Sequence, residues 1–171
     1  QTTGILLAAG EALLDLAETF ELQAEAAEIA RFNALSRAAL LARWSAEHRR
    51  FLSLDLISGE PILAPTQAGF IPLLALDLPE DIARAAEAEM RRWSQGMAVI
   101  FPTTPADSPA FEPRRYWRGP VWPIIDWLLI LGLRRNGAPG FAEDIRRSVL
   151  DAIGRSGFCE YFDPTTGEAC G

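Results

Sequence analysis

The stretch RYWRGPVWPIIDW, residues 115–127, concentrates aromatic and guanidinium side chains in a way that ordinary helix sequence does not. Three of the chain's five tryptophans, a tyrosine, two arginines and two prolines occupy these positions. Each proline removes a backbone donor, and the rings and guanidinium groups need specific partners if they are buried. The stretch is therefore either an unusually aromatic part of a core or a binding surface for a ligand.

A second segment of chemical interest is SGFCEYFDPTTGEACG, residues 156–171, because it sets a carboxylate among apolar residues. Most loop glutamates are simply solvated, but Glu160 is flanked by Phe158, Cys159, Tyr161 and Phe162. Such an apolar setting is unusual for a solvated loop acid.

Few other residues suggest a reactive centre. Cys159 and Cys170 lack the companions that a zinc site needs, and His48 is the only histidine. We therefore expect free thiols, no metal and no cofactor.

Composition narrows the classes of partner. The chain has 171 residues, 49% of them hydrophobic, and a formal net charge of -7. An acidic chain is a poor match for nucleic acid, which normally requires a basic face. Its apolar runs are too short to cross a bilayer, and no leader pattern opens the chain, so we expect no membrane partner and a cytoplasmic location.

The elements that must position these residues are predicted to be mainly helical, because Ala, Leu, Glu and Arg recur with a period near 3.6. Three predicted helices, 4–20, 67–77 and 121–133, are apolar on most sides and are expected to be packed all round. Three others are amphipathic, namely 21–44, 78–93 and 141–157. Their apolar stripes are Leu22, Ala26, Ile29 and Phe32; Ile82, Ala86 and Met90; and Phe141, Ile145, Val149 and Ile153.

The two kinds of helix alternate, and the buried kind recurs roughly every 55 to 60 residues. Short turns follow the buried helices, whereas long irregular connections follow the amphipathic ones. This alternation favours a double ring of antiparallel helices with its long loops on one face, where function usually resides. A helical solenoid is the alternative, but solenoid repeats have tight turns on both sides.

Residues from about Trp44 onward resemble a known group of enzymes. PAFEPRRYWRGPVWPIIDWLLILGL followed by SGFCEYFDPTTGE resembles the C-terminal half of the (α/α)6-toroid α-glycosidases of glycoside hydrolase family 63, especially the bacterial hydrolases of mannosylglycerate and glucosylglycerate. SLDLISGEPILAPTQAGFIPLLA is similar to the segment that precedes these motifs in that group. The resemblance implies an all-α fold: one partial (α/α)6-toroid domain over residues 1–171, with about three inner/outer helix pairs.

The resemblance also implies roles for individual residues. The group uses an inverting mechanism with two carboxylic acids, and its general base maps onto Glu160. Its sugar-contacting aromatic residues map onto Tyr116, Trp117 and Trp122, so the rings would form the wall on which a hexose stacks. Tyr161 belongs to the same motif as Glu160 and is an expected substrate contact.

Several neighbouring residues have weaker expectations. Asp126 lies four residues after Trp122 on one helix face, so it is expected to reach the same cavity. Family members commonly have asparagine at Asp126 and near Ile124, and these departures affect the polar lining. Arg118 is expected to be structural, and Asp163 and Glu168 to be turn acids.

The group's general acid, an aspartate in a Gly-Trp-Asp-Asn-like element, has no counterpart in this chain. We therefore expect a fragment that associates with a missing N-terminal half or with another copy. Three functions remain open: the catalytic half of an α-glycosidase for a small carbohydrate, a degenerate carbohydrate-binding module, and a helical interaction scaffold without a sugar site.

Overall fold

Helices form most of the chain, and proline explains where three of them begin. The computed structural model describes residues 1–171. The helices are α1 (Thr2–Thr19), α2 (Gln23–Leu41), the 3-10 helix η1 (Gln67–Leu74), α3 (Glu80–Ser94), α4 (Pro123–Arg135) and α5 (Pro139–Ser156). Pro79 precedes α3, and Pro123 and Pro139 open α4 and α5, where a missing N–H breaks no helical hydrogen bond. No helix is both long enough and apolar enough to span a bilayer.

The apolar segment predicted as a helix over 67–77 is shorter and more tightly wound than expected. It forms the 3-10 helix η1, ends at Leu74 and contains Pro72, which lacks the N–H that a continuing helix would use. Helix α4 crosses η1 closely at Gly132, where an added Cβ would fall 2.8 Å from the carbonyl carbon of Leu73. Glycine at this position lets the two backbones pack against each other.

The few strands are short antiparallel pairs within the long connections. Each strand has two residues, and the pairs are β1 (Trp44–Ser45) with β2 (Arg50–Phe51), β3 (Ser53–Leu54) with β4 (Pro61–Ile62), and β5 (Tyr161–Phe162) with β6 (Ala169–Cys170). They brace the loops and add no sheet layer to the all-α architecture.

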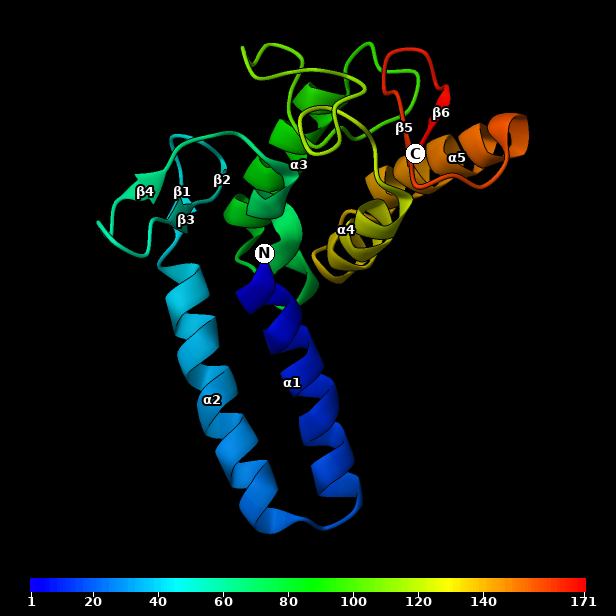
Figure 1. The fold of residues 1–171 in the computed structure, drawn as a ribbon. Coiled ribbons are helices and arrows are strands. Elements are labelled where there is room, and N and C mark those ends of the chain that lie inside the picture. Colours follow the sequence, from blue (N-terminus) through cyan, green and yellow to red (C-terminus); the bar gives the residue numbers. More distant parts are fainter.

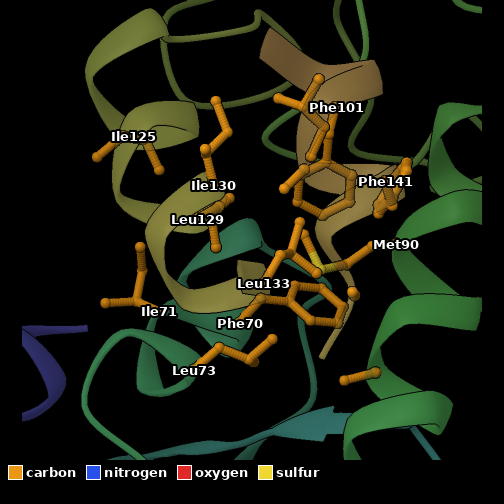
Figure 2. Close-up of a cluster of buried hydrophobic side chains, with 14 of the residues drawn as sticks. Phe70, Ile71, Leu73, Met90, Phe101, Ile125, Leu129, Ile130, Leu133 and Phe141 are labelled. Carbon is orange, nitrogen blue, oxygen red and sulfur yellow. The ribbon is translucent and has the colours of Figure 1, made fainter. Parts of the chain in front are cut away.

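The core lies among η1, α3, α4 and α5 (Figure 2). Phe70 packs edge-on against Trp93 and Phe101, and the rings of Trp93 and Phe101 stack with centroids 5.4 Å apart. The predicted apolar stripes of α3 and α5 face this core: Ala86, Met90, Phe141, Ile145 and Val149 are buried, while Ile82 and Ile153 are half-buried. Both stripes are therefore confirmed.

Helices α1 and α2 depart from the prediction. They form a hairpin that extends away from the other helices (Figure 1). Helix α1 is not packed all round, since only Gly4, Leu7, Gly10 and Ala17 are buried. The stripe predicted for α2 is only partly covered, because Leu22 and Phe32 are exposed while Ala26 and Ile29 are half-buried. The buried residues of α2 are Asn33, Ser36 and Leu40. Within residues 1–171 the hairpin has neighbours on one side only, so its remaining apolar residues face outward.

The three long connections gather at one end of the helices, as predicted (Figure 1). Backbone hydrogen bonds join them: the Gln67 N–H donates to the Thr103 carbonyl, and Val121 and Phe162 form an antiparallel bridge. Helices α1, η1 and α4 all begin at this end. The candidate residues on the second and third connections are therefore brought together.

Candidate active site

Four aromatic side chains form one cluster at the loop end. The Trp117 and Trp122 rings stack with centroids 4.2 Å apart, and Tyr161 stacks on Trp122 at 5.0 Å. Tyr116 meets the other three rings edge-on, at centroid distances of 5.6, 4.7 and 5.7 Å. Edge-to-face and offset-stacked rings hold one another in fixed orientations, so the cluster is a rigid surface.

The cluster has an exposed front and a buried back. Tyr116 and Trp117 are each 47% exposed, whereas Trp122 is 5% exposed and belongs to the core. The indole N–H of Trp122 donates to the Tyr116 carbonyl at 2.9 Å. Exposure therefore separates these residues: Trp122 is part of the core, whereas Tyr116 and Trp117 lie at the surface of the protein.

The backbone of residues 112–119 shapes this surface. Tyr116 has φ of 38°, a left-handed conformation that is rare for a bulky residue. The Glu112 N–H donates to the Arg118 carbonyl, closing the loop, and a Cβ at Gly119 would fall 2.6 Å from the Glu112 carbonyl oxygen. The Arg118 guanidinium donates to the Ala110 carbonyl and pairs with Glu112, which confirms its structural role.

Glu160 adjoins the exposed side of this cluster. It immediately precedes strand β5, whose Phe162 pairs with Val121 ahead of α4. The Tyr116 hydroxyl donates to Glu160 Oε1 at 3.3 Å, and Glu160 itself is exposed. Desolvation and the nearby negative charge of Glu160 raise the pKa of Tyr116 above its usual value. One tyrosine ring therefore links the Glu160 carboxylate to both indoles.

Asp163 and Arg114 hold the Glu160 hairpin against the aromatic loop. Asp163 Oδ1 accepts hydrogen bonds from the N–H and hydroxyl of Thr165 and from the Thr166 N–H, so Asp163 is a turn acid as predicted. Arg114 donates to Asp163 Oδ2 at 3.0 Å and also pairs with Glu168. Burial acts to raise the pKa of Asp163, but the hydrogen bonds from Thr165 and Arg114 outweigh it and leave the pKa lowered.

Asp126 does not line this site. Its side chain has no exposed surface, and neither carboxylate oxygen has a hydrogen-bond partner. The first turn of α4 turns it inward, so the expectation that it reaches a cavity with Trp122 needs correction. Burial raises the pKa of Asp126 well above the usual aspartate value. The backbone N–H of Phe101 lies nearby and acts to lower the pKa, but it does not form a hydrogen bond with Asp126.

A cavity of about 190 Å³ adjoins Trp117 at the starts of α1, η1 and α4. Its lining includes Gln67 at the start of η1, Thr103 from the second long connection, and Ile125 from α4. Gln67 and Thr103 were missed by reasoning from the sequence. The only available signal was a carboxamide at the head of the otherwise apolar run QAGFIPLLAL.

Comparison with known proteins identifies the family. The sequence model of one protein family, the mannosylglycerate hydrolase MGH1-like glycoside hydrolase domain, matches residues 1–171. The chain belongs to this family. Among its curated relatives, a mannosylglycerate hydrolase of Thermus thermophilus is 37% identical over 88% of this chain and 36% of its own length. Mannosylglycerate hydrolase MGH1 of Selaginella moellendorffii is 33% identical over 99% of the chain and 35% of its own length.

Further relatives of this chain include one named for a different sugar and one of known structure. A glucosylglycerate hydrolase of Mycolicibacterium hassiacum is 35% identical over 68% of this chain and 27% of its own length. The crystal structure of a family 63 mannosylglycerate hydrolase from Thermus thermophilus, solved with glucose, superposes with a TM-score of 0.93 at 37% identity, covering 99% of this chain and 40% of that one. The fold is therefore part of an (α/α) toroid of glycoside hydrolase family 63. The chain spans between 27% and 40% of the length of these relatives.

Proposed function

We propose that this chain is the C-terminal catalytic part of a glycoside hydrolase that cleaves a small α-mannoside or α-glucoside, such as mannosylglycerate or glucosylglycerate. The observation that carries the proposal is the contact of the Glu160 carboxylate with the half-exposed Tyr116–Trp117 surface. A carboxylate beside a flat aromatic surface can act on a sugar ring stacked there. The family membership and the names of the relatives support the same chemistry.

In the proposed mechanism, Glu160 is the general base of an inverting reaction. It takes a proton from a water that attacks the anomeric carbon, while a second carboxylic acid protonates the leaving oxygen. Tyr116 holds the Glu160 carboxylate through its hydroxyl, and Trp122 and Tyr161 support the sugar-facing rings from behind. The general acid belongs to the portion of the enzyme that lies outside these residues.

That portion is also the partner we propose for the α1–α2 hairpin. Leu6, Leu13 and Phe32 are each more than half exposed there and border a cavity of about 480 Å³. Contiguous exposed apolar surface of this kind is typical of an interface. The relatives are more than twice as long as this chain, which supports a preceding part of the toroid as its cover.

The reaction and its stereochemistry can be followed together. The polypeptide that carries this chain is incubated with mannosylglycerate or glucosylglycerate, and the anomer of the first released sugar is recorded by proton NMR. Inversion of an α-linkage gives the β-anomer first. Initial release of the α-anomer would contradict the inverting mechanism, and no hydrolysis of any small α-glycoside would contradict the proposed function.

The role of Glu160 is tested by Glu160→Gln in the same polypeptide. The kcat should fall by about 10²- to 10⁴-fold with little change in substrate affinity, because a base acts only in the transition state. Glu168→Gln is the matched control, since Glu168 lies in the same hairpin but pairs with Arg114. Steady-state kinetics that show near-native turnover for Glu160→Gln would remove the assignment.

A further inference from the structure

The side chain of Gln67 is buried and has no partner. Gln67 is 4% exposed, yet neither its amide nitrogen nor its amide oxygen makes a hydrogen bond. Its backbone is well satisfied, because the Gln67 N–H donates to the Thr103 carbonyl at 2.9 Å. A buried carboxamide without hydrogen bonds is destabilising, so its presence needs an explanation.

The surroundings of Gln67 indicate what could satisfy it. Gln67 lines the cavity of about 190 Å³ together with Thr103 and the half-exposed Trp117. Thr103 Oγ1 accepts a hydrogen bond from the Gly119 N–H, which leaves the hydroxyl hydrogen free to donate. Ile71 and Ile125 supply apolar walls. The cavity thus combines one indole, one carboxamide, one hydroxyl and apolar sides.

This combination matches the chemistry of a pyranose ring. A carboxamide offers two donors and one acceptor, so it can bind hydroxyl groups that both donate and accept. The indole offers an apolar face for sugar C–H groups. The volume is well below that of pockets for drug-sized ligands, so the cavity fits one sugar ring or part of one.

Trp117 connects this cavity to the proposed reaction centre. Its ring packs edge-on against Tyr116, whose hydroxyl binds Glu160, and the same residue lines the cavity with Gln67. We propose that Gln67 is a substrate-binding residue that binds hydroxyl groups of the hexose stacked on Trp117. This inference rests on the proposed function and assigns the polar side of its sugar site.

A second buried carboxamide provides a matched control. Asn33 is 7% exposed and also lacks hydrogen-bond partners, but it lies between α1 and α2, in the cavity beside Leu6 and Phe32. Neither Trp117 nor Glu160 lines that cavity. Gln67→Met and Asn33→Leu each remove an unsatisfied carboxamide while keeping a side chain of similar size.

The experiment measures binding of methyl α-mannoside and methyl α-glucoside by titration calorimetry, using the polypeptide that carries this chain. Gln67→Met should bind the hexoside about tenfold more weakly, the loss expected for one or two neutral hydrogen bonds. Its melting temperature should not fall, because the amide has no partner among residues 1–171 in the absence of ligand. Asn33→Leu should leave hexoside affinity unchanged.

Monodeoxy sugars provide a second measurement, because the loss of affinity is first recorded on the native protein and so does not depend on how well a variant folds. One monodeoxy analogue of the hexoside should lose affinity for the native protein, and its affinity should be insensitive to Gln67→Met, because the hydroxyl that Gln67 binds is already absent. Equal hexoside affinity of native protein and Gln67→Met, with hydrolysis intact, would overturn the role of Gln67 and leave the proposed function standing. Absence of both hexoside binding and hydrolysis in the native protein would overturn both.

Discussion

Neighbouring tryptophans of this chain have opposite roles. Trp117 exposes about half of its surface, whereas Trp122 stacks directly behind it and is almost fully buried. A sugar that stacks on this cluster therefore meets Trp117, and Trp122 fixes the plane of the Trp117 ring. The two residues should respond differently to truncation, since only Trp117 has exposed surface on which a sugar can stack.

Trp117→Ala should weaken substrate binding by about 1 to 3 kcal/mol through lost apolar contact. The effect should appear as a raised KM, with a smaller change in kcat than Glu160→Gln produces. Trp127→Ala is the matched control, because Trp127 is 55% exposed on α4 and belongs to no aromatic pair. Steady-state kinetics measure both variants, and equal KM values for them would argue against stacking on Trp117.

Asp126 is a residue whose charge opposes folding. Its pKa is raised in the folded state, so the folded protein binds more protons than the unfolded one above the ordinary aspartate pKa near 4. Stability therefore falls as pH rises from that value through the raised pKa. Because Asp126 lacks partners for either oxygen, an uncharged side chain of the same shape removes this cost.

Asp126→Asn should accordingly raise the melting temperature at pH 7 by a few degrees, since about 1 kcal/mol corresponds to roughly 2 to 4 °C in a domain of this size. The gain should shrink as pH is lowered and vanish near pH 3, below the ordinary aspartate pKa, where the aspartate is protonated in both states. Thermal unfolding followed by circular dichroism between pH 3 and 8 tests this. A gain that is independent of pH would contradict the assigned cause.

At the scale of the elements, the β5–β6 hairpin and the aromatic loop act as one unit. Main-chain pairing of Val121 with Phe162 and the Arg114–Asp163 ion pair connect them across the loop end. Glu160 precedes this hairpin and Tyr116 belongs to the loop, so their contact depends on the same connection. Loss of the connection should therefore affect both stability and the position of Glu160.

Asp163→Asn tests the connection through its pH dependence. The pKa of Asp163 is lowered in the folded protein, so its charge contributes stability above the ordinary aspartate pKa, and this contribution is lost as pH falls through the lowered value. At pH 7 the variant should lose about 1.5 to 3 kcal/mol, the range for hydrogen bonds to a charged group. The deficit should close at acidic pH in thermal unfolding, and a deficit that persists there would indicate a different cause.

At the scale of the whole molecule, the site is built from loops that a partial ring of helices holds at one end. Glu160 and the aromatic surface are in place, but the chain spans 36% of one mannosylglycerate hydrolase relative and 40% of another. Several other acids near the loop end have structural contacts. Asp55, for example, accepts hydrogen bonds from the N–H groups of Ile57 and Ser58 in its own turn.

The purified 171-residue chain should therefore show no measurable hydrolysis of mannosylglycerate, glucosylglycerate or short α-glucosides. General acid catalysis typically contributes about 10²- to 10⁴-fold, and an open half-ring also fails to exclude water from the base. Adding the upstream part of the polypeptide in trans should restore turnover. Robust hydrolysis by the chain alone would show that it contains its own general acid.

The sequence by itself determined the helical architecture and the segments that form the site. Periodicity predicted the core faces of α3 and α5, because a helix covered along one stripe must repeat apolar residues with its own period. The alternation of short and long connections predicted that the second and third long connections share one end. In a double ring of antiparallel helices, the connections that follow the amphipathic helices all emerge on the same side. The resemblance of two motifs then placed Glu160 and the aromatic residues in one expected site.

Only the tertiary structure decided which side chains are exposed at the loop end and which face the core. Trp122 is buried, Asp126 turns inward, and Gln67 enters the cavity from a different connection. Sequence spacing gives the face of a helix, but the neighbour that covers that face comes from residues far away in the chain. For α1, predicted to be packed all round, and for the apolar stripe of α2, the predicted burial was incomplete for the same reason. Apolar residues indicate that a surface is to be covered, and only the packing of other elements determines where the cover lies.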